Sequence, residues 1–349
     1  MKKVAVIGHF AHGLEYLDGQ TVKTKNITNE LYKTYEEENV ICFDTHGGIK
    51  TLIKAPIYAF KALRNAKNVI ILPAHNGLRV FGRLLPLLKK FFKNRKIFYI
   101  VIGGWLPQKL HKKRFLSKAL RKFDGIFVET NTMKSELVKQ GFENVSVVPN
   151  FKELTILSEE DLVYQNQKPY RLCTFSRVMK EKGIETAIDV IHRVNEKIEN
   201  RVYSLDIYGQ VDSGQIEWFE NLKKKFKSDV KYCGCVDSKK SVEVLKDYYA
   251  LLFPTHYYTE GIPGTIIDAY AAGIPVISAK WESFTDVVEE GITGIGYEFN
   301  DEIDLEQKLI AVAKNPSILI DMKKNCLKKS NSYTPRVAME RIMNGLNYN

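Results

Sequence analysis

The sequence predicts an α/β protein made of two doubly wound, Rossmann-like domains that face each other across a cleft. Three observations lead to this prediction. The chain has 349 residues, which exceeds what one hydrophobic core usually fills. Its composition, with 44% hydrophobic and 27% charged residues, is that of an ordinary globular protein. Short β-rich runs alternate with helix-length segments, which is typical of parallel sheets covered by helices on both faces.

In the first half, six β-rich runs are separated by stretches long enough for helices. The first run follows a basic start but ends at Gly8 without a small-residue cleavage site, so we interpret it as a strand rather than a signal peptide. No apolar stretch approaches the roughly 18 residues that a membrane-spanning helix needs. The strands predicted in this half are 4–8, 39–44, 68–73, 96–104, 125–130 and 145–150.

The second half repeats the alternation, with a helical pattern at 183–198. A polar stretch, 151–168, separates the halves and indicates the domain boundary. We therefore expect domains at 1–160 and 161–333, followed at 334–349 by a terminal helix with Pro335 in its first turn, which could cross back to the first domain. The strands predicted in this half are 171–178, 203–209, 230–236, 250–256 and 275–279.

Five cysteines are scattered through the chain, an odd number that favours reduced thiols in a cytoplasmic protein. Cys233 and Cys235 have no second pair of metal-ligand residues at suitable spacing, so we interpret them as strand residues rather than zinc ligands.

The most distinctive stretch begins after Glu260. Between Gly261 and Ala279 the only charged residue is Asp268, in a segment that reads as an apolar helix opening at Pro263. A carboxylate in such a helix needs a hydrogen-bond donor, either from the protein or from a ligand hydroxyl. Small residues at the helix start would let an anion approach the free amides, where the helix dipole favours negative charge. The alternative is a buried helix with an internally paired Asp268.

A second stretch, FSRVMKEKGIETA, places Arg177 at a strand end and Lys182 at the start of the next helix. Two cations beside a helix N-terminus are suited to clamp a phosphate, because Arg presents a planar fork and Lys a mobile point charge. The alternative is a pair of solvated surface charges.

Together these stretches resemble the retaining glycosyltransferases of family 4, which have the GT-B fold. The resemblance is specific from about residue 171 to 299 and weaker before that. Its residues are Arg177, Lys182, Gly183, Gly234, Pro254, Glu260, Gly261, Ala269, Gly273, Pro275, Val276, Gly291 and Gly294.

The resemblance implies a role for each part of the site. Arg177 and Lys182 would hold the diphosphate of a nucleotide sugar and stabilise it as the leaving group, and Glu260 would hold the donor sugar. Asp268 would bind the ribose hydroxyls, although the family usually has Glu there, and the shorter Asp would make the contact longer or water-bridged. The other implied donor-binding residues are Gly209, Gly234, Gly261, Ile262, Pro263, Gly264 and Thr265.

The N-terminal half departs further from the family. The segment DGQTVKTK resembles its glycine-bearing loop, which places Gly19 and Gln20 beside the phosphates. His75 follows a strand end where the family often has a histidine on the acceptor side, although a lone His is also often structural. At the next strand end many relatives have a histidine, but this chain has Gly103 and Gly104, so that sugar contact is not inherited.

The resemblance also implies a mechanism without a protein nucleophile, in which the leaving phosphate assists deprotonation of the acceptor. There is no Asp-x-Asp motif, which the other main glycosyltransferase fold uses to bind a metal and the diphosphate, so we expect no metal and no cofactor. The first loop also lacks the Gly-x-Gly-x-x-Gly spacing of dinucleotide-binding proteins.

The positive charge is concentrated in the first half. The formal net charge of the chain is +11, but residues 1–160 alone hold 27 Lys and Arg against 14 Asp and Glu. Between 45 and 123 there are 19 Lys and Arg and no acid. We interpret this as an anionic-membrane surface, in which a helix within 108–123 would lie on lipid through Leu116, Leu120 and Phe123. The alternative is that this apolar stripe packs on its own sheet. The predicted patch comprises Arg79, Arg83, Lys89, Lys90, Lys112, Lys113, Arg114, Lys118, Arg121 and Lys122.

The sequence thus predicts a cytoplasmic enzyme peripheral to the inner face of the cell membrane. It would transfer a hexose-type sugar to a saccharide acceptor, lipid-linked, in capsule, O-antigen or related bacterial polysaccharide synthesis. Nucleic acid is not expected as a partner, because no nucleic-acid-binding motif accompanies the charge. One alternative is another GT-B enzyme, such as a nucleotide-sugar epimerase or phosphorylase. The other is a non-catalytic partner subunit that binds a sugar nucleotide or a membrane.

Overall fold

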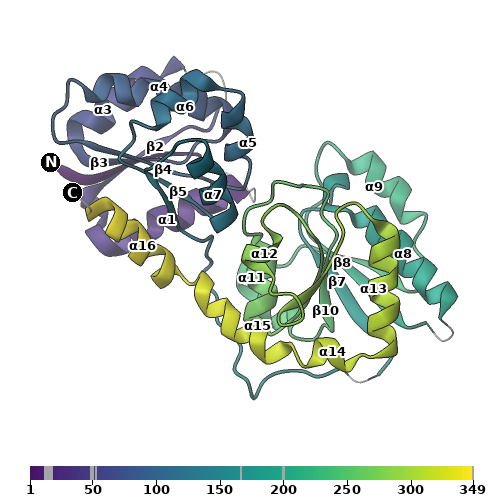
Figure 1. The fold of residues 1–349 in the computed structure, drawn as a ribbon. Helices are drawn as coiled ribbons and strands as arrows, with labels where there is room; N and C mark the ends of the chain where they lie inside the picture. The colour runs from purple at the N-terminus through teal and green to yellow at the C-terminus, as the bar shows by residue number, and fades with distance from the viewer. Residues whose placement is uncertain (12–18, 48–50, 52, 166, 199–200, 348–349) are drawn as a thin grey trace. The chain divides into compact units, whose positions relative to one another are not determined.

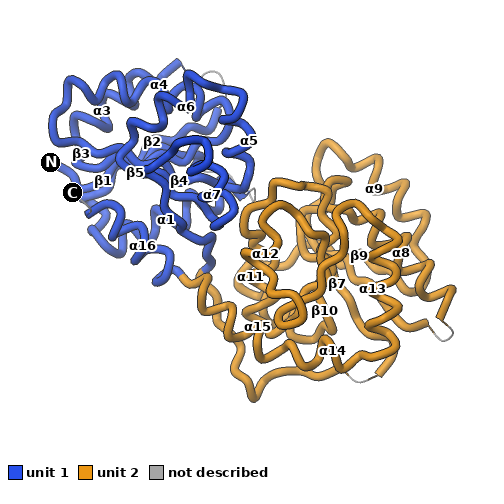
Figure 2. Tube along the Cα trace, in the orientation of Figure 1, with its two compact units in different colours: residues 1–152, 335–349 blue, residues 153–334 orange. Residues whose placement is uncertain are grey.

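The computed structural model describes residues 1–11, 19–47, 51, 53–165, 167–198 and 201–347. It divides the chain into two compact units, residues 1–152 with 335–349 and residues 153–334 (Figure 2). Each unit is an α/β domain with a parallel sheet (Figure 1).

Within the described residues of unit 1, six parallel strands have the order β2-β1-β3-β4-β5-β6. The strands are β1 (Lys2–Gly8), β2 (Val40–Asp44), β3 (Ala66–Ile71), β4 (Lys96–Ile100), β5 (Gly125–Val128) and β6 (Val145–Val147). The helices are α1 (Gly19–Tyr35), α3 (Ala55–Asn65), α4 (His75–Lys89), α5 (Leu106–His111), α6 (Arg114–Leu120), α7 (Asn131–Lys139) and α16 (Pro335–Asn347), with a 3₁₀ turn, η1 (Glu37–Asn39).

Helices cover both faces of the unit 1 sheet (Figure 1). On one face, α3 to α7 bury alanines, leucines and phenylalanines against the strands. On the other, α1 packs beside α16, whose Ala338, Met339 and Ile342 are buried against Val4 and Val6 of β1. The last helix therefore completes the core of the unit that contains the N-terminus.

Within the described residues of unit 2, six parallel strands have the order β12-β11-β10-β7-β8-β9. The strands are β7 (Tyr170–Phe175), β8 (Tyr203–Tyr208), β9 (Val230–Gly234), β10 (Ala250–Phe253), β11 (Val276–Ala279) and β12 (Gly294–Tyr297). The helices are α8 (Ile184–Lys197), α9 (Ile216–Lys223), α10 (Ser241–Leu245), α11 (Gly264–Ala271), α12 (Phe284–Val287), α13 (Glu302–Lys314), α14 (Ser317–Ile320) and α15 (Lys323–Ser330). The 3₁₀ turns are η2 (Lys180–Lys182), η3 (Ser238–Lys240) and η4 (Asn331–Tyr333).

The unit 2 sheet is buried on both faces. One face packs on α8, α9 and α13, and the other on α10, α11 and α15. In this sheet β8 and β9 lie on one side of β7, whereas β10, β11 and β12 extend from β7 in the opposite direction. The carboxyl ends of β7 and β10 therefore flank the topological switch point, where open α/β sheets form a crevice for ligands.

The division between the units lies at 152–153, eight residues before the predicted boundary. The segment that follows is part of the second core, because Leu154, Ile156 and Leu157 pack against its buried residues. The backbone amide of Leu157 also donates to the carbonyl of Ala271, at 2.9 Å. The sequence did not indicate that residues 154–157 pack in this core, because the following segment, 158–168, is polar.

The prediction of one amphipathic helix within 108–123 is wrong. The segment forms α5 and α6, with a break at Lys112 and Lys113. Leu116, Leu120 and Phe123 are buried against the unit 1 sheet. This apolar stripe therefore packs on its own domain and is not available to lipid.

Candidate functional site

Two sequence motifs meet at the switch point of unit 2. Arg177 follows β7 by two residues, and the loop that contains Glu260 connects β10 to α11. β7 and β10 are neighbours in the sheet. Because the strands are parallel, both segments leave the same edge of the sheet.

An ion pair joins these segments. The ammonium of Lys182, in η2, donates to Oε1 of Glu260, and both side chains are mostly buried. The hydroxyl of Thr255 donates to the same oxygen at 3.1 Å. No described residue hydrogen-bonds Oε2 of Glu260. The carboxylate is therefore held in place with one oxygen available to a ligand.

The turn that carries Lys182 is pressed against the end of β10. Gly183 has a φ of 68°, in the left-handed region. A Cβ atom at this position would lie 1.8 Å from the carbonyl oxygen of Pro254. Only glycine fits so close an approach, which lets Lys182 reach Glu260.

Arg177 lies near the same cluster. Its guanidinium is half exposed and lies 3.5 Å from a carboxylate oxygen of Asp212. The ring of Tyr257 lies 5.0 Å from the ammonium of Lys182. Burial raises the pKa of the Tyr257 phenol, as does the charge of Glu181. The structure thus brings Lys182 and Glu260 together beside Tyr257, with Arg177 after the neighbouring strand β7, and we call Arg177, Lys182, Tyr257 and Glu260 the Tyr257 cluster.

The start of α11 has features of an anion site. Its N-cap is Pro263, whose side chain provides no hydrogen bond to the first amides. Thr265, in the first turn, has a buried hydroxyl with no hydrogen-bond partner among the described residues. Gly264 and Thr265 are partly exposed. The first amides can therefore donate to a ligand at the positive end of the helix dipole.

Asp268 is bonded within the protein. It is 3% exposed, and its Oδ1 accepts a hydrogen bond of 2.9 Å from the hydroxyl of Ser241. The sequence left open whether the donor to Asp268 comes from the protein or from a ligand hydroxyl, and the structure shows a donor from the protein. A ribose contact of Asp268 stays a prediction.

The other predicted glycines of unit 2 occupy different environments. A Cβ atom on Gly209 would lie 1.8 Å from the carbonyl oxygen of Ser176, so this glycine lets β8 end against the residue before Arg177. No described atom lies within 4 Å of the position that a Cβ atom on Gly234 would take, so this glycine faces open space. Gly261 and Ile262 are buried in the loop before α11.

In unit 1, Gly19 and Gln20 open α1, but the preceding residues 12–18 of the predicted loop lie outside the described residues. Gly19 is exposed and Gln20 is half-buried. Their predicted contact with phosphates stays a prediction. His75 is exposed at the start of α4, where its Nδ1 lies 3.0 Å from the ammonium of Lys109.

Sequence reasoning missed a histidine pair at the carboxyl ends of β1 and β2. Nδ1 of His9 lies 2.7 Å from the hydroxyl of Thr21, and Nε2 of His9 lies 3.0 Å from Nδ1 of His46. Each histidine follows a predicted strand by one or two residues, and this position could have indicated that the two side chains lie close together. Tyr257 was also missed, although it lies in the loop just before Glu260.

Two cations of the predicted membrane patch have partners within the fold. Lys89 pairs with Asp124 at 2.6 Å, and Arg121 donates to the carbonyl of Gln140 and lies over the ring of Phe142. The prediction treated Lys89 and Arg121 as unpaired charges of a membrane patch, whereas the structure gives each of them a partner within the protein. The remaining cations of the patch are exposed: Arg79, Arg83, Lys90, Lys112, Lys113, Arg114, Lys118 and Lys122.

The part of the chain that the structure describes contains no group of three or more His, Cys, Asp or Glu side chains placed to hold a metal ion. No helix within that part is long and apolar enough to cross a membrane.

Comparison with known proteins places this site in a family context. Residues 161–329 match the family model described as glycosyl transferases group 1. This stretch, just under half of the chain, is similar to group 1 glycosyltransferases. It contains the Tyr257 cluster and the start of α11.

An uncharacterized glycosyltransferase of Methanocaldococcus jannaschii is 22% identical over 272 residues, which cover 75% of this chain and 63% of that protein. The chain therefore spans less than two thirds of this relative, and the matches to two further curated relatives span 30% and 32% of their lengths.

Solved structures agree with the fold of the whole chain. HepE of Anabaena, in complex with UDP, matches with a TM-score of 0.74 and 14% identity over 99% of each chain. The lipopolysaccharide outer core galactosyltransferase WaaB matches with a TM-score of 0.72 and 18% identity over 99% of each chain. The predicted two-domain GT-B fold is confirmed.

Proposed function

We propose that this chain is a retaining glycosyltransferase that transfers a hexose-type sugar from a nucleoside-diphosphate sugar to a saccharide acceptor. The observation that supports this most directly is the Tyr257 cluster. It places two cations and a fixed carboxylate at the switch point of unit 2, within the stretch that matches the group 1 glycosyltransferase model. The negative charge of a nucleoside diphosphate would complement these cations.

The cations and the helix start would bind the pyrophosphate together. The half-exposed guanidinium of Arg177 offers a planar pair of donors. Lys182 can keep its bond to Glu260 and still donate two further hydrogens. The first amides of α11 add neutral donors. These groups would supply the positive charge that a metal ion supplies in other enzymes, so the proposed reaction needs neither metal nor cofactor.

Glu260 would orient the sugar. Its free Oε2 can accept a hydrogen bond from a sugar hydroxyl while Oε1 stays bonded to Lys182 and Thr255. In the proposed reaction the acceptor oxygen bonds to the anomeric carbon on the face that the diphosphate leaves. The bond from that carbon to the diphosphate breaks, and the acceptor proton passes to a phosphate oxygen. Positioning and charge stabilisation of the leaving group would provide most of the rate enhancement.

A transfer assay tests this function. Labelled UDP-, GDP-, ADP- and dTDP-sugars are incubated with the protein and a lipid-linked saccharide fraction, and the anomeric configuration of the product is determined by NMR. We expect a new glycoside with the configuration of the donor. Release of an epimer or a sugar phosphate instead would favour the alternative GT-B enzymes, and no turnover with any donor would favour a binding subunit.

A matched pair of lysine variants tests the site. Lys182→Met removes the charge that pairs with Glu260, and kcat/KM should fall by about 100-fold or more, since a charge that stabilises the leaving diphosphate is lost. Lys180→Met removes a lysine from the same η2 turn that has no carboxylate partner among the described residues, and should leave transfer nearly unchanged. Glu260→Ala and Arg177→Ala should resemble Lys182→Met. Wild-type rates for these variants would contradict the site.

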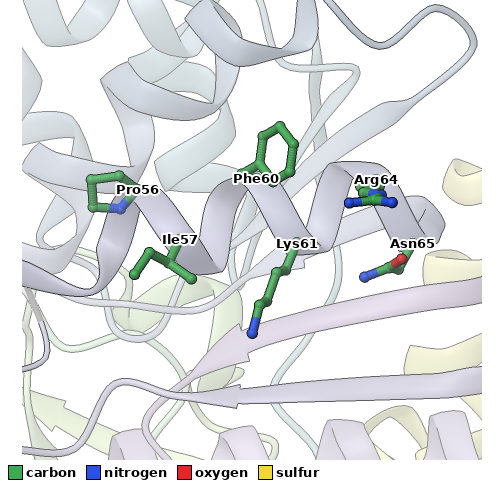
Figure 3. A pocket seen from close by; sticks show the side chains of 6 residues that line it. All are labelled: Pro56, Ile57, Phe60, Lys61, Arg64 and Asn65. Atoms are coloured by element: carbon green, nitrogen blue, oxygen red, sulfur yellow. The ribbon is translucent and has the colours of Figure 1, made fainter.

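The proposed acceptor is lipid-linked, and the protein would act at the inner face of the cell membrane in surface polysaccharide synthesis. Exposed apolar side chains lie among the exposed cations of unit 1. Phe91 is 81% and Phe115 is 83% exposed, close in sequence to Lys90 and Arg114. A pocket of about 470 Å³ runs along α3 and adds apolar and basic side chains (Figure 3). Its lining residues are Pro56, Ile57, Phe60, Lys61, Arg64 and Asn65.

This surface suits an anionic membrane, because each basic residue near such a surface contributes about 1 kcal/mol and aromatic side chains enter the interface. Vesicle flotation tests it. We expect recovery with anionic vesicles and little with neutral ones, and a reduction when Phe91 and Phe115 are both changed to Ser. Equal recovery with neutral and anionic vesicles would contradict the membrane assignment. No nucleic-acid partner is proposed.

A further inference from the structure

A basic and aromatic cluster in unit 1 lies outside the Tyr257 cluster. His75 opens α4 after β3, and Trp105 caps the start of α5 after the neighbouring strand β4. Lys109 lies one turn along α5 from Trp105. All three residues therefore lie at the carboxyl edge of the unit 1 sheet, the edge at which parallel α/β sheets bind ligands.

The three side chains contact one another. Nε1 of Trp105 donates to the carbonyl of Ile102 at 2.8 Å, which fixes the indole. The imidazole of His75 packs on that indole, with ring centroids 4.3 Å apart. The ammonium of Lys109 lies 4.9 Å from the indole centroid and 3.0 Å from Nδ1 of His75. The cluster is thus a built arrangement rather than a set of independent surface residues.

The hydrogen bond from Lys109 decides what His75 can do. Nδ1 accepts from the ammonium, so a neutral imidazole carries its proton on Nε2. Burial and the charge of Lys109 lower the pKa of His75, which favours this neutral form. The Nε2 proton is then a donor available to a ligand.

Positive charge around Lys109 is not balanced. Arg79 lies one turn after His75 within α4, and Lys113 lies four residues after Lys109, directly before α6. Burial and the charges of these two cations lower the pKa of Lys109. None of the three pairs with an acid among the described residues, and the sequence has no Asp or Glu from 45 to 123. The three cations and the Nε2–H group of His75 therefore form a site with excess positive charge, which a bound anion would balance.

The backbone of His75 supports a functional role. Its φ is 29°, an unusual conformation for a residue with a side chain. Such a conformation costs on the order of 1–3 kcal/mol and persists where the surroundings enforce it, often at ligand sites.

We propose that His75, Trp105 and Lys109, with Arg79 and Lys113, bind a phosphate group of the saccharide acceptor. The proposal deepens the proposed function and rests on it for the assignment of the ligand as an acceptor. A phosphate suits the cluster better than a carboxylate does, because it presents three or more oxygens to donors that come from α4, α5 and the residue before α6. The indole supplies an apolar surface beside the phosphate for the attached sugar. Arg79 and Lys113, assigned from sequence to the membrane patch, are thereby assigned to a substrate site.

The test uses Trp105 as a reporter. The chain has three tryptophans, and Trp218 and Trp281 belong to unit 2. The full-length protein is labelled with 5-fluorotryptophan, and the Trp105 resonance is identified from Trp105→Phe. Inorganic phosphate, glucose 1-phosphate and glucose are titrated at constant ionic strength. We expect the Trp105 resonance to shift in a saturable way with the two phosphates and not with glucose.

Two variants provide the specific result and its control. Lys109→Met should weaken the phosphate-induced shift by about tenfold in apparent Kd, since it removes a charge-assisted hydrogen bond. Lys67→Met removes an exposed lysine on β3, at the opposite end of that strand from His75, and should leave Kd unchanged. Absence of a Trp105 shift, or the same Kd in Lys109→Met and the wild type, would overturn the site.

A further arm separates an acceptor phosphate from a lipid headgroup. If vesicles containing phosphatidate shift the Trp105 resonance and glucose 1-phosphate does not, the group bound is a membrane headgroup and the acceptor proposal is wrong. The assay does not depend on sugar transfer. A Trp105 response in a protein that binds no nucleotide sugar would sustain the phosphate site and overturn the proposed function instead.

Discussion

At the scale of single residues, the proposed donor site depends on a glycine that has no functional side chain. Gly183 permits the contact with Pro254 that brings Lys182 to Glu260. The sequence indicated Gly183, because a Lys-Gly pair at a helix start is part of the family resemblance. It did not indicate the contact with Pro254, since Pro254 lies 71 positions later and the contact depends on the packing of β7 beside β10.

Gly183→Ala should destabilise the protein by about 3 kcal/mol or more, because the new Cβ is strained by a left-handed φ and also meets the Pro254 carbonyl. Gly291→Ala is the matched control. Gly291 has a similar φ of 73°, but no described atom lies within 4 Å of its Cβ position, so the loss should be near ~1 kcal/mol. Urea denaturation measures both. Equal losses would show that the close approach to Pro254 does not matter.

Lys323 provides a pH-dependent test of the unit 2 core. Its side chain is fully buried, donates to the Tyr248 carbonyl at 3.2 Å, and has a pKa lowered by burial from 10.5 to about 8. Below pH 8 the lysine is charged in both the folded and the unfolded state, and the buried charge lowers stability. As the pH rises from 8 to 10.5, the folded state loses the proton first, so the free energy of unfolding increases by about 3 kcal/mol.

The comparison of wild type with Lys323→Met isolates this effect, since other titrating groups are common to both proteins. Denaturation curves between pH 7 and 10.5 should show the wild type gaining stability relative to the variant. Parallel pH profiles would mean that Lys323 keeps a normal pKa in the folded protein.

At the scale of elements, the strands were predictable and the short helices were not. Eleven runs predicted as strands correspond to strands of the structure, because continuous apolar runs between helical segments are typical of buried parallel strands. β12 was not predicted, since its sequence GIGY is rich in glycine. The break between α5 and α6 was hidden because its two lysines are compatible with a helix.

The same limit applies to Asp268. Sequence showed that this carboxylate needs a donor but could not choose between a ribose and the protein. Ser241, on α10, supplies the hydrogen bond from 27 positions earlier. Such a partner depends on how α10 packs against α11, which a local pattern does not encode.

Ser241→Ala should reduce the free energy of unfolding by about 1–3 kcal/mol, because it leaves the buried carboxylate without this donor. Ser238→Ala, an exposed serine in the preceding turn, should have little effect. In a double-mutant cycle, Ser241→Ala should cost much less when Asp268 is already Ala. Additive losses would show that the two side chains do not stabilise each other.

At the scale of the whole molecule, the two units differ in charge and in what the sequence revealed about them. Unit 2 carries the motifs that predicted its site, and the structure joins Lys182 to Glu260, with Arg177 after the neighbouring strand end. Unit 1 carries the excess of Lys and Arg, and its pattern predicted an anionic partner without locating the contact. In the cluster around Trp105, the family resemblance indicated only His75, and its contacts with Trp105 and Lys109 from the next strand end were not predicted.

The central proposal about this protein is that unit 2 binds a sugar nucleotide through the Tyr257 cluster. Thermal unfolding of the wild type with UDP-, GDP-, ADP- and dTDP-sugars tests it directly, since a ligand at about 100 times its Kd stabilises the folded state by about 2.7 kcal/mol. We predict that one nucleotide raises the Tm of the wild type and of Lys180→Met, and that Arg177→Ala and Lys182→Met lose most of this increase. An increase of the same size in all four proteins, or none with any nucleotide sugar, would contradict this binding site.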